Sequence, residues 1–125
     1  MVKKVCLDSD VCIAILRNEP RAQQIKDLIF DAEVCISTVT VFELLLRRTN
    51  LEIVDEFIGK MDRLSLNEHA ARYASSLYKT LEQNGTPIEL RDLFIAATCI
   101  AHDCFFITFN VKHFERVHGL KLIKI

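Results

Sequence analysis

The chain has 125 residues, half of them hydrophobic, with a formal net charge of -1 at pH 7. This size and apolar content predict a single domain, residues 1–125, that can bury its own core. The near-neutral charge excludes a broadly cationic nucleic-acid binder, so a polyanionic partner must be attracted locally or through a metal ion. No apolar run reaches the length of a membrane span, and no signal peptide is recognisable, which predicts a cytoplasmic protein without membrane contact.

Short apolar runs alternate with helical patterns along the chain. Strands are expected at residues 5–7, 34–36, 64–66, 104–108 and 120–125. Helices are expected at residues 11–16, from Pro20 to Ala32, from Ser37 or Thr40 to about Arg48, and at 49–58, 67–83 and 90–101. Strands that alternate with helices favour a three-layer α/β/α domain with a central, mostly parallel sheet.

The five cysteines show no C-x-x-C spacing and lie mostly in apolar runs. This distribution predicts free buried thiols in a reducing cytosol, not a zinc or redox motif.

Two polar side chains follow expected strands directly. Asp8 comes after the first strand and Asn110 follows residues 104–108. Parallel strands end at the same edge of a sheet, where open α/β folds place their sites. Asp8, Ser9 and Asp10 can each serve as an N-cap, but only one can do so, which leaves at least one carboxylate without a structural role.

The capping patterns also separate structural from functional acids. Thr86-x-x-Glu89, with Pro87 at the first helical position, is a complete capping box, so Glu89 is interpreted as structural. Glu43 would complete a second box if Thr40 were the N-cap, but it has no capping role if Ser37 is the cap.

Asp92 is placed beyond the first turn of this helix, which is otherwise apolar nearly all round. A lone buried carboxylate is unfavourable unless it is paired or bound to a cation. The neighbouring Arg91 points about 100° away around the helix and is a poor partner. Asp92 is therefore interpreted as a functional residue.

Three carboxylates at one sheet edge would repel one another, and would either become protonated or hold a divalent cation. Oxygen ligands select Mg²⁺ or Mn²⁺ over zinc. A metal in an acidic cleft can bind a phosphate that bare carboxylates would repel, so phosphodiester hydrolysis is the favoured chemistry.

Four segments and the chain end occur in the order typical of one family. They are Val5 to Ile13, Cys35 to Leu44, Asp92 to Ala97, Thr108 to Phe114, and the closing Gly119 to Leu122. Together they resemble PIN-domain ribonucleases, most closely the toxin-type, VapC-like branch. The resemblance implies a Mg²⁺- or Mn²⁺-dependent endoribonuclease that acts on RNA and pairs with a small antitoxin protein. It places Asp8, Glu43 and Asp92 at the acidic metal-site positions.

Two positions depart from the family pattern. Residue 110, where many relatives carry a fourth Asp, is Asn, whose amide oxygen could still bind the metal with less negative charge. Residue 10, often a small neutral polar residue, is Asp, and we hypothesise that it restores the missing charge. The expected catalytic residues are thus Asp8, Glu43, Asp92 and Asn110, with the same four and Asp10 as metal ligands.

Phosphate contacts are less well defined by the sequence. Basic candidates near the site are Arg47, Arg48, Arg91, Lys112 and His113, although such side chains at helix ends usually face solvent. His102 is interpreted as a helix-end donor. Apolar helix faces near residues 25–29 and 51–58 favour a homodimer.

Two alternative functions remain open at the level of sequence. Asp8-Ser9-Asp10 after a strand also fits a haloacid-dehalogenase-like phosphatase, with Asp8 as nucleophile and Asp10 as acid/base, but Glu43 would then be idle. The second alternative is a non-catalytic RNA- or protein-binding module on the same fold, in which Asn110 has weakened the metal site.

Overall fold

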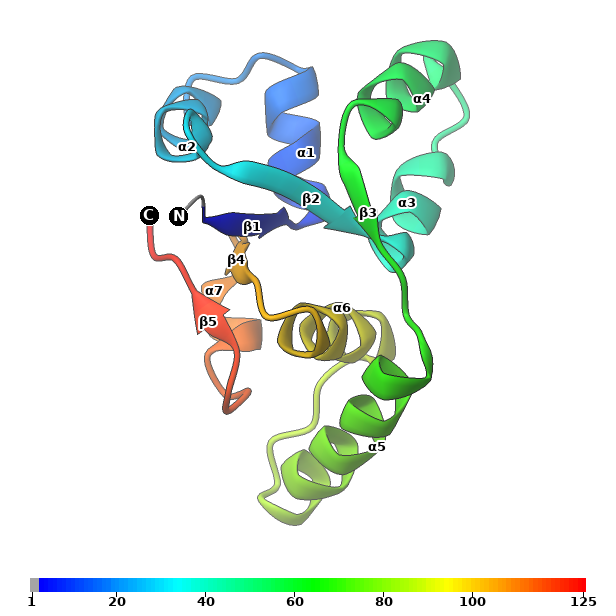
Figure 1. The fold of residues 1–125 in the computed structure, drawn as a ribbon, viewed down its shortest axis with the longest axis vertical. Coiled ribbons are helices and arrows are strands. Elements are labelled where there is room, and N and C mark those ends of the chain that lie inside the picture. The colour runs from blue at the N-terminus through cyan, green and yellow to red at the C-terminus, as the bar shows by residue number, and fades with distance from the viewer. Residues whose placement is uncertain (1–2) are drawn as a thin grey trace.

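The computed structural model describes residues 3–125 as a five-stranded parallel sheet covered by helices on both faces (Figure 1). The strands are β1 (Lys4–Leu7), β2 (Glu33–Ser37), β3 (Asp62–Leu64), β4 (Phe105–Ile107) and β5 (Lys121–Leu122). The helices are α1 (Ser9–Leu16), α2 (Ala22–Ile29), α3 (Thr38–Leu45), α4 (Leu51–Gly59), α5 (Glu68–Gln83), α6 (Leu90–Ala101) and α7 (Val111–Phe114). Within residues 3–125, no helix is long and apolar enough to cross a membrane.

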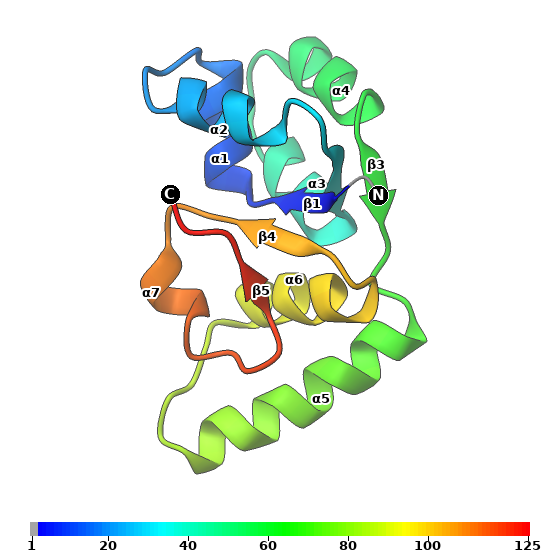
Figure 2. The same ribbon diagram turned by 60° about the vertical axis from the view of Figure 1, so that its left-hand side comes forward.

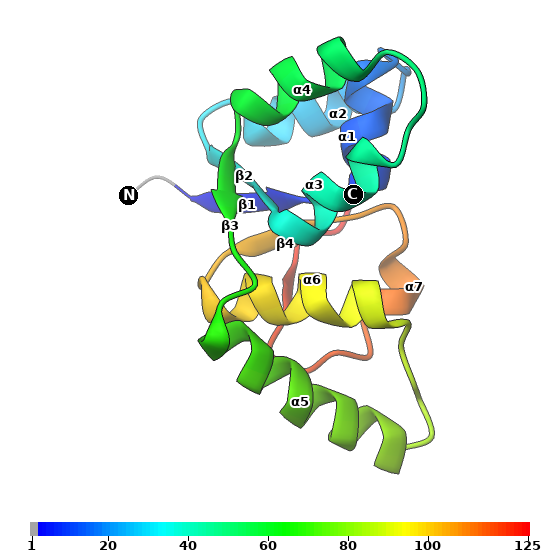
Figure 3. The same ribbon diagram turned by 90° about the vertical axis from the view of Figure 1, so that its right-hand side faces the viewer.

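The side-chain alternation of the strands divides the core into two layers. Val5 and Leu7 of β1 pack on one face of the sheet with α1, α2 and α4, whereas Cys6 packs on the opposite face with α5 and α6. Figure 3 shows the sheet between these two helical layers. The expected three-layer α/β/α fold is confirmed.

The strand order β3-β2-β1-β4-β5 places β1 at the centre, and all four neighbouring pairs are parallel. The chain first moves outward from β1 through β2 and β3, and later adds β4 and β5 on the other side of β1, where Figure 2 shows both strands. The order therefore reverses between β1 and β4. A crevice at the carboxyl ends of the strands is expected at this point, where a site is usually found in such sheets.

Helix α6 spans residues 90–101 as expected, but its N-cap is not the one that the Thr86 capping box predicts. Its N-cap is Glu89, whose Oε2 accepts hydrogen bonds from the backbone N–H groups of Arg91 and Asp92 at 3.1 and 3.3 Å. The expected Thr86 capping box is therefore wrong, because the Glu89 carboxylate itself satisfies the free N–H groups. Asp92 consequently lies within the first turn of α6, not beyond it.

Three other local expectations need correction. Asn50, in the left-handed region at φ 59°, precedes α4, so this helix begins at Leu51 and not at the expected residue 49. The third strand lies at β3, two residues before the expected segment 64–66. Helix α7 was not expected, because four residues are too few to show helical periodicity.

Candidate active site

Asp8 stands at the junction between β1 and α1 and is only 5% exposed. It is the N-cap of α1, and its Oδ1 accepts a hydrogen bond from the Ser9 backbone N–H at 2.9 Å. Its Oδ2 accepts a 2.7 Å hydrogen bond from the Thr108 hydroxyl. Burial and the nearby Asp10 charge raise the pKa of Asp8 to about 7, although both hydrogen bonds act in the opposite direction.

Asp10 lies in the first turn of α1 and contacts the segment that follows β4. Its Oδ2 accepts a hydrogen bond from the Phe109 backbone N–H at 3.2 Å, whereas its buried Oδ1 has no partner among residues 3–125. Burial raises the pKa of Asp10, and the charge of Asp92 adds to this effect. Because Asp8 is the N-cap, Asp10 is the carboxylate that capping leaves free.

Glu43 projects from the second turn of α3. Ser37 is the N-cap of this helix, because its Oγ accepts from the Thr40 backbone N–H at 3.0 Å, so Glu43 has no capping role. The Glu43 Oε1 is buried and without a partner in the described part of the chain, and Oε2 lies 3.9 Å from Nη1 of Arg91. Burial raises the pKa of Glu43, and the charge of Asp92 raises it further.

Asp92 enters the same cluster from the first turn of α6. Its Oδ2 lies 3.5 Å from Nδ1 of His113, which follows β4 in α7. Burial raises the pKa of Asp92, as does the charge of Glu89. Electrostatic repulsion links Asp8 to Asp10 and Glu43, and Asp92 to Asp10 and Glu43. The fold thus brings together four carboxylates from three separate segments of the chain.

Asn110 occupies a different position from the four acids. It is exposed, and its backbone N–H donates to the Thr108 hydroxyl at 3.0 Å. Asn110 precedes α7 without capping it through its side chain. Through its backbone contact with Thr108, Asn110 lies at the exposed rim of the cluster, whereas Asp10 contributes a partly buried carboxylate.

This donor set fits a hard divalent cation. All the candidate donors are oxygen atoms, two of them are buried without a hydrogen-bond partner, and all four pKa values are raised as expected when no cation balances the charge. No three carboxylate groups within residues 3–125 bring oxygens within 4.8 Å of one another. The spacing suits a partly hydrated ion, and Mg²⁺ usually retains several waters and takes only one or two carboxylates.

Basic and aromatic side chains border the cluster. Arg91 lies 3.6 Å from Glu89 as well as near Glu43, and His113 lines a small cavity of about 140 Å³ together with Asp92 and Arg116. Arg21 was missed by sequence reasoning. Its guanidinium lies 3.9 Å from the ring centroid of Phe109, and its charge lowers the pKa of Asp10.

The other basic candidates do not join this group. Arg47 and Arg48 line hollows beside Asn50 and Ile53 at the start of α4. Lys112 is exposed. His102 ends α6 as expected, and its Nε2 lies 3.0 Å from the Ser65 carbonyl oxygen.

Comparison with known proteins now decides the family. The model of the PIN domain matches residues 5–120. The chain belongs to the PIN domain family. The tRNA(fMet)-specific endonuclease VapC of Shigella flexneri is 28% identical over 125 residues, which are 94% of this chain and 95% of that protein. The predicted resemblance to the VapC-like branch of PIN domains is therefore confirmed.

Solved structures show the same PIN fold. DNA-bound VapBC from Salmonella typhimurium aligns with a TM-score of 0.85 and 27% identity, covering 98% of each chain. VapBC2 from Rickettsia felis, bound to a DNA fragment from the promoter, aligns with a TM-score of 0.83 and 22% identity over 96% of this chain and 97% of that one.

Proposed function

We propose that this PIN domain is a divalent-metal-dependent endoribonuclease that hydrolyses RNA phosphodiester bonds and is the toxin of a toxin-antitoxin pair. The observation that carries the proposal is the group of four carboxylates, Asp8, Asp10, Glu43 and Asp92, at the carboxyl edge of the sheet. The relative of known activity is an RNA endonuclease that aligns over nearly its whole length.

Asp8, Glu43, Asp92 and Asn110 are the proposed catalytic residues, and these four together with Asp10 would hold Mg²⁺ or Mn²⁺. When bound, such an ion neutralises phosphate charge and lowers the pKa of a nearby water. Thr108 and the Ser9 backbone fix the orientation of the Asp8 carboxylate. The free oxygens of Asp10 and Glu43 remain available as ligands.

The residues around the acids have roles in binding RNA. Arg21 is held over the Phe109 ring, and Arg91 lies beside Glu43, so both guanidinium groups are placed to contact phosphates that flank the scissile bond. Asp92 and His113 face the same small cavity, where His113 would orient the Asp92 carboxylate.

A small antitoxin protein is the proposed partner. Solved structures similar to this chain include VapBC assemblies, of which the Salmonella typhimurium protein is 27% identical. We also propose a homodimer. Leu51 and Ile53 of α4 are 44% and 58% exposed, and Leu28 of α2 is 42% exposed, although Ile25, Val54, Phe57 and Ile58 on the same helices are buried.

The phosphatase alternative is not favoured. It would leave Glu43 without a role, whereas Glu43 is part of the carboxylate cluster and keeps a buried oxygen free of hydrogen bonds. A beryllofluoride adduct on Asp8 would be the signature of that alternative.

The proposal is tested by incubating a mixed structured RNA pool with the purified chain, freed of any partner, in Mg²⁺, in Mn²⁺ and in chelator. Cleavage is expected only with metal, and Asp92→Asn should abolish it. Asp55→Asn, a matched change at an exposed position of α4, should cleave like the wild type. Absence of cleavage by folded wild type in both metals would overturn the catalytic proposal and favour the non-catalytic binding module.

A further inference from the structure

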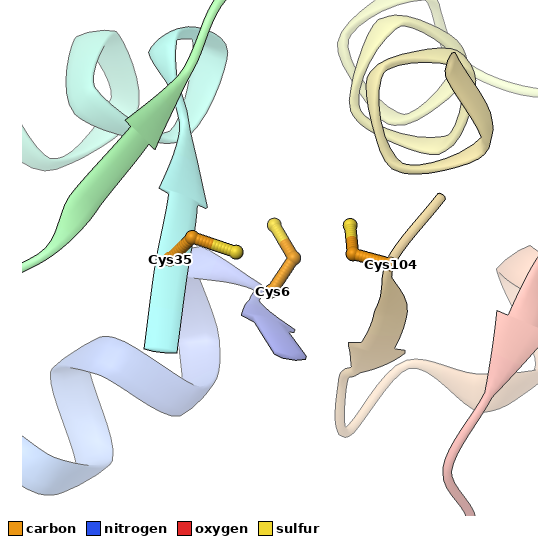
Figure 4. Close-up of side chains that lie close together, drawn as sticks. All are labelled: Cys6, Cys35 and Cys104. Atoms are coloured by element: carbon orange, nitrogen blue, oxygen red, sulfur yellow. The ribbon is translucent and has the colours of Figure 1, made fainter. Parts of the chain in front are cut away.

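Three cysteines that are far apart in the sequence lie close together on the face of the sheet that α5 and α6 cover. Cys6 of β1 is the register partner of Cys35 of β2, and Cys104 immediately precedes β4 on the other side of β1. Their three Sγ atoms all lie within 4.8 Å of one another, and all three residues are buried (Figure 4). Because each thiol comes from a different strand, no C-x-x-C spacing marks the group.

A fourth thiol, that of Cys99 on α6, lies beside this group. Cys99 of α6 is fully buried in the same core, and its carbonyl oxygen accepts a hydrogen bond from Cys104 Sγ at 3.5 Å. The Cys99 thiol also interacts with the thiols of Cys6 and Cys104. Cys12, by contrast, packs on the opposite face of the sheet.

The thiols of the group interact with one another. Interactions with the thiols of Cys35, Cys6 and Cys99 lower the pKa of Cys104, whereas the interaction with Cys104 raises the pKa values of Cys6 and Cys35. A group of close thiols is a chemical environment from which soft metal ions displace protons.

We propose that Cys6, Cys35 and Cys104 form a binding site for one thiophilic divalent cation of the Zn²⁺ class, with Cys99 as the fourth ligand. Zn²⁺ binds thiolates at about 2.3 Å in a tetrahedron, which places sulfur atoms about 3.8 Å apart. The sulfurs of Cys6, Cys35 and Cys104, which lie within 4.8 Å of one another, would have to approach by up to about 1 Å, and the Cys99 thiol would have to move toward them from α6. The four thiols release protons as the ion enters, so binding tightens as pH rises.

The position of the thiols relative to the carboxylates gives the site a structural role. Strand alternation directs Cys6 and Asp8 to the same face of the sheet, and likewise Cys35 and Ser37. On α6, Asp92 and Cys99 are seven residues apart, which is about two turns, and so share one face of the helix. An ion bound by the thiols would therefore connect α6 with β1 and β2 next to the carboxylate cluster.

The test uses untagged, fully reduced wild-type protein titrated with Cd²⁺, and follows the ultraviolet absorption that arises only from thiolate-to-metal charge transfer. One ion per chain is expected, with a rise in melting temperature. Carboxylate ligands give no such absorption, so Asp92→Asn should retain the full signal even though it loses nuclease activity.

The cysteine variants locate the site. Cys35→Ala and Cys104→Ala should lose the charge-transfer signal, whereas Cys12→Ala, a change at a buried thiol on the other face, should retain it. No signal at one equivalent in the wild type would overturn the proposal, whether or not the variants fold. A signal that survives Cys35→Ala, in a variant shown to be folded by circular dichroism, would also overturn it and leave the cysteines as apolar core residues.

Discussion

Thr108 donates a 2.7 Å hydrogen bond to Oδ2 of Asp8 across 100 positions of sequence. The same hydroxyl accepts from the backbone N–H of Asn110 at 3.0 Å. One buried side chain thus joins the end of β1 to the segment that leads into α7. Sequence reasoning named Asp8 and Asn110 but not the residue that connects them.

Replacing Thr108 by Val should disturb this connection with little change in shape. The substitution leaves the Asp8 oxygen and the Asn110 N–H without their partner, so the free energy of unfolding should fall by about 1–3 kcal/mol. RNA cleavage should fall as well. Chemical denaturation measures the stability loss, and Thr108→Ser, which keeps the hydroxyl, should recover most of both properties. Unchanged stability in the Val variant would show that the hydroxyl and its hydrogen bonds make no net contribution.

Stability without metal should fall as pH rises from about 4 to about 7. The pKa of Asp8 is about 7 in the folded chain against 3.8 for the unfolded reference, so in this window the folded state holds a proton that the unfolded state has lost. The contribution of the Asp8 proton to the free energy of unfolding is complete below about pH 4 and is lost above about pH 7. At about 1.4 kcal/mol per pKa unit, the change is on the order of 4 kcal/mol at most. Denaturation in chelator as a function of pH measures it.

Asp8→Asn provides the matched comparison, because the amide does not titrate. Its stability should change much less with pH, and near pH 8 it should exceed that of the wild type in chelator. A wild-type stability that rises between pH 4 and pH 7 would contradict the raised pKa values of all four acids.

Mg²⁺ or Mn²⁺ should raise the melting temperature of the wild type. An ion that binds only the folded state stabilises it by about 2.7 kcal/mol at one hundred times its Kd. The shift should be absent in Asp92→Asn and should be preserved in Asp55→Asn. Differential scanning fluorimetry over a series of metal concentrations gives both the shift and the affinity. An equal shift in wild type and Asp92→Asn would place the ion elsewhere.

Asp10 and Asn110 should have opposite effects on metal affinity when their charges are changed. Asp10→Asn removes a carboxylate with a buried free oxygen and should weaken Mg²⁺ binding, whereas Asn110→Asp adds a charge at the rim and should strengthen it. Calorimetric titration of both variants compares them with the wild type. Unchanged affinity in Asp10→Asn would disprove the hypothesis that Asp10 restores the charge missing at position 110.

Arg21 should act on RNA binding and leave the chemical step unaffected. Because its guanidinium is exposed over Phe109, Arg21→Ala should raise KM for RNA, keep kcat, and reduce the slope of log affinity against log salt by about one. Arg63→Ala provides a control, since this exposed arginine donates to the Ile58 and Met61 carbonyls beside β3. A change in kcat with constant KM would indicate a different role for Arg21.

The sequence was sufficient to predict the parts of the site that follow from strand ends and helix caps. Asp8 follows β1 as expected, and the choice between Ser37 and Thr40 as N-cap was correctly seen to decide whether Glu43 is free. The Thr86 box failed because Glu89, a residue type that sequence preference does not favour as an N-cap, caps α6 with its own carboxylate. Arg21 and Thr108 could not be assigned because their contacts depend on how distant segments pack.

The central place of β1 bears on how the protein is made. Residues 4–7 are synthesised long before one of their two neighbouring strands, β4 at residues 105–107. Because domains fold during synthesis at about 5–20 residues per second, the growing chain spends several seconds without this partner strand. During that interval Asp8 and Asp10 have neither Thr108 nor the Phe109 N–H to hold them. The supports that orient the Asp8 and Asp10 carboxylates therefore form only after Thr108 and Phe109 have been synthesised.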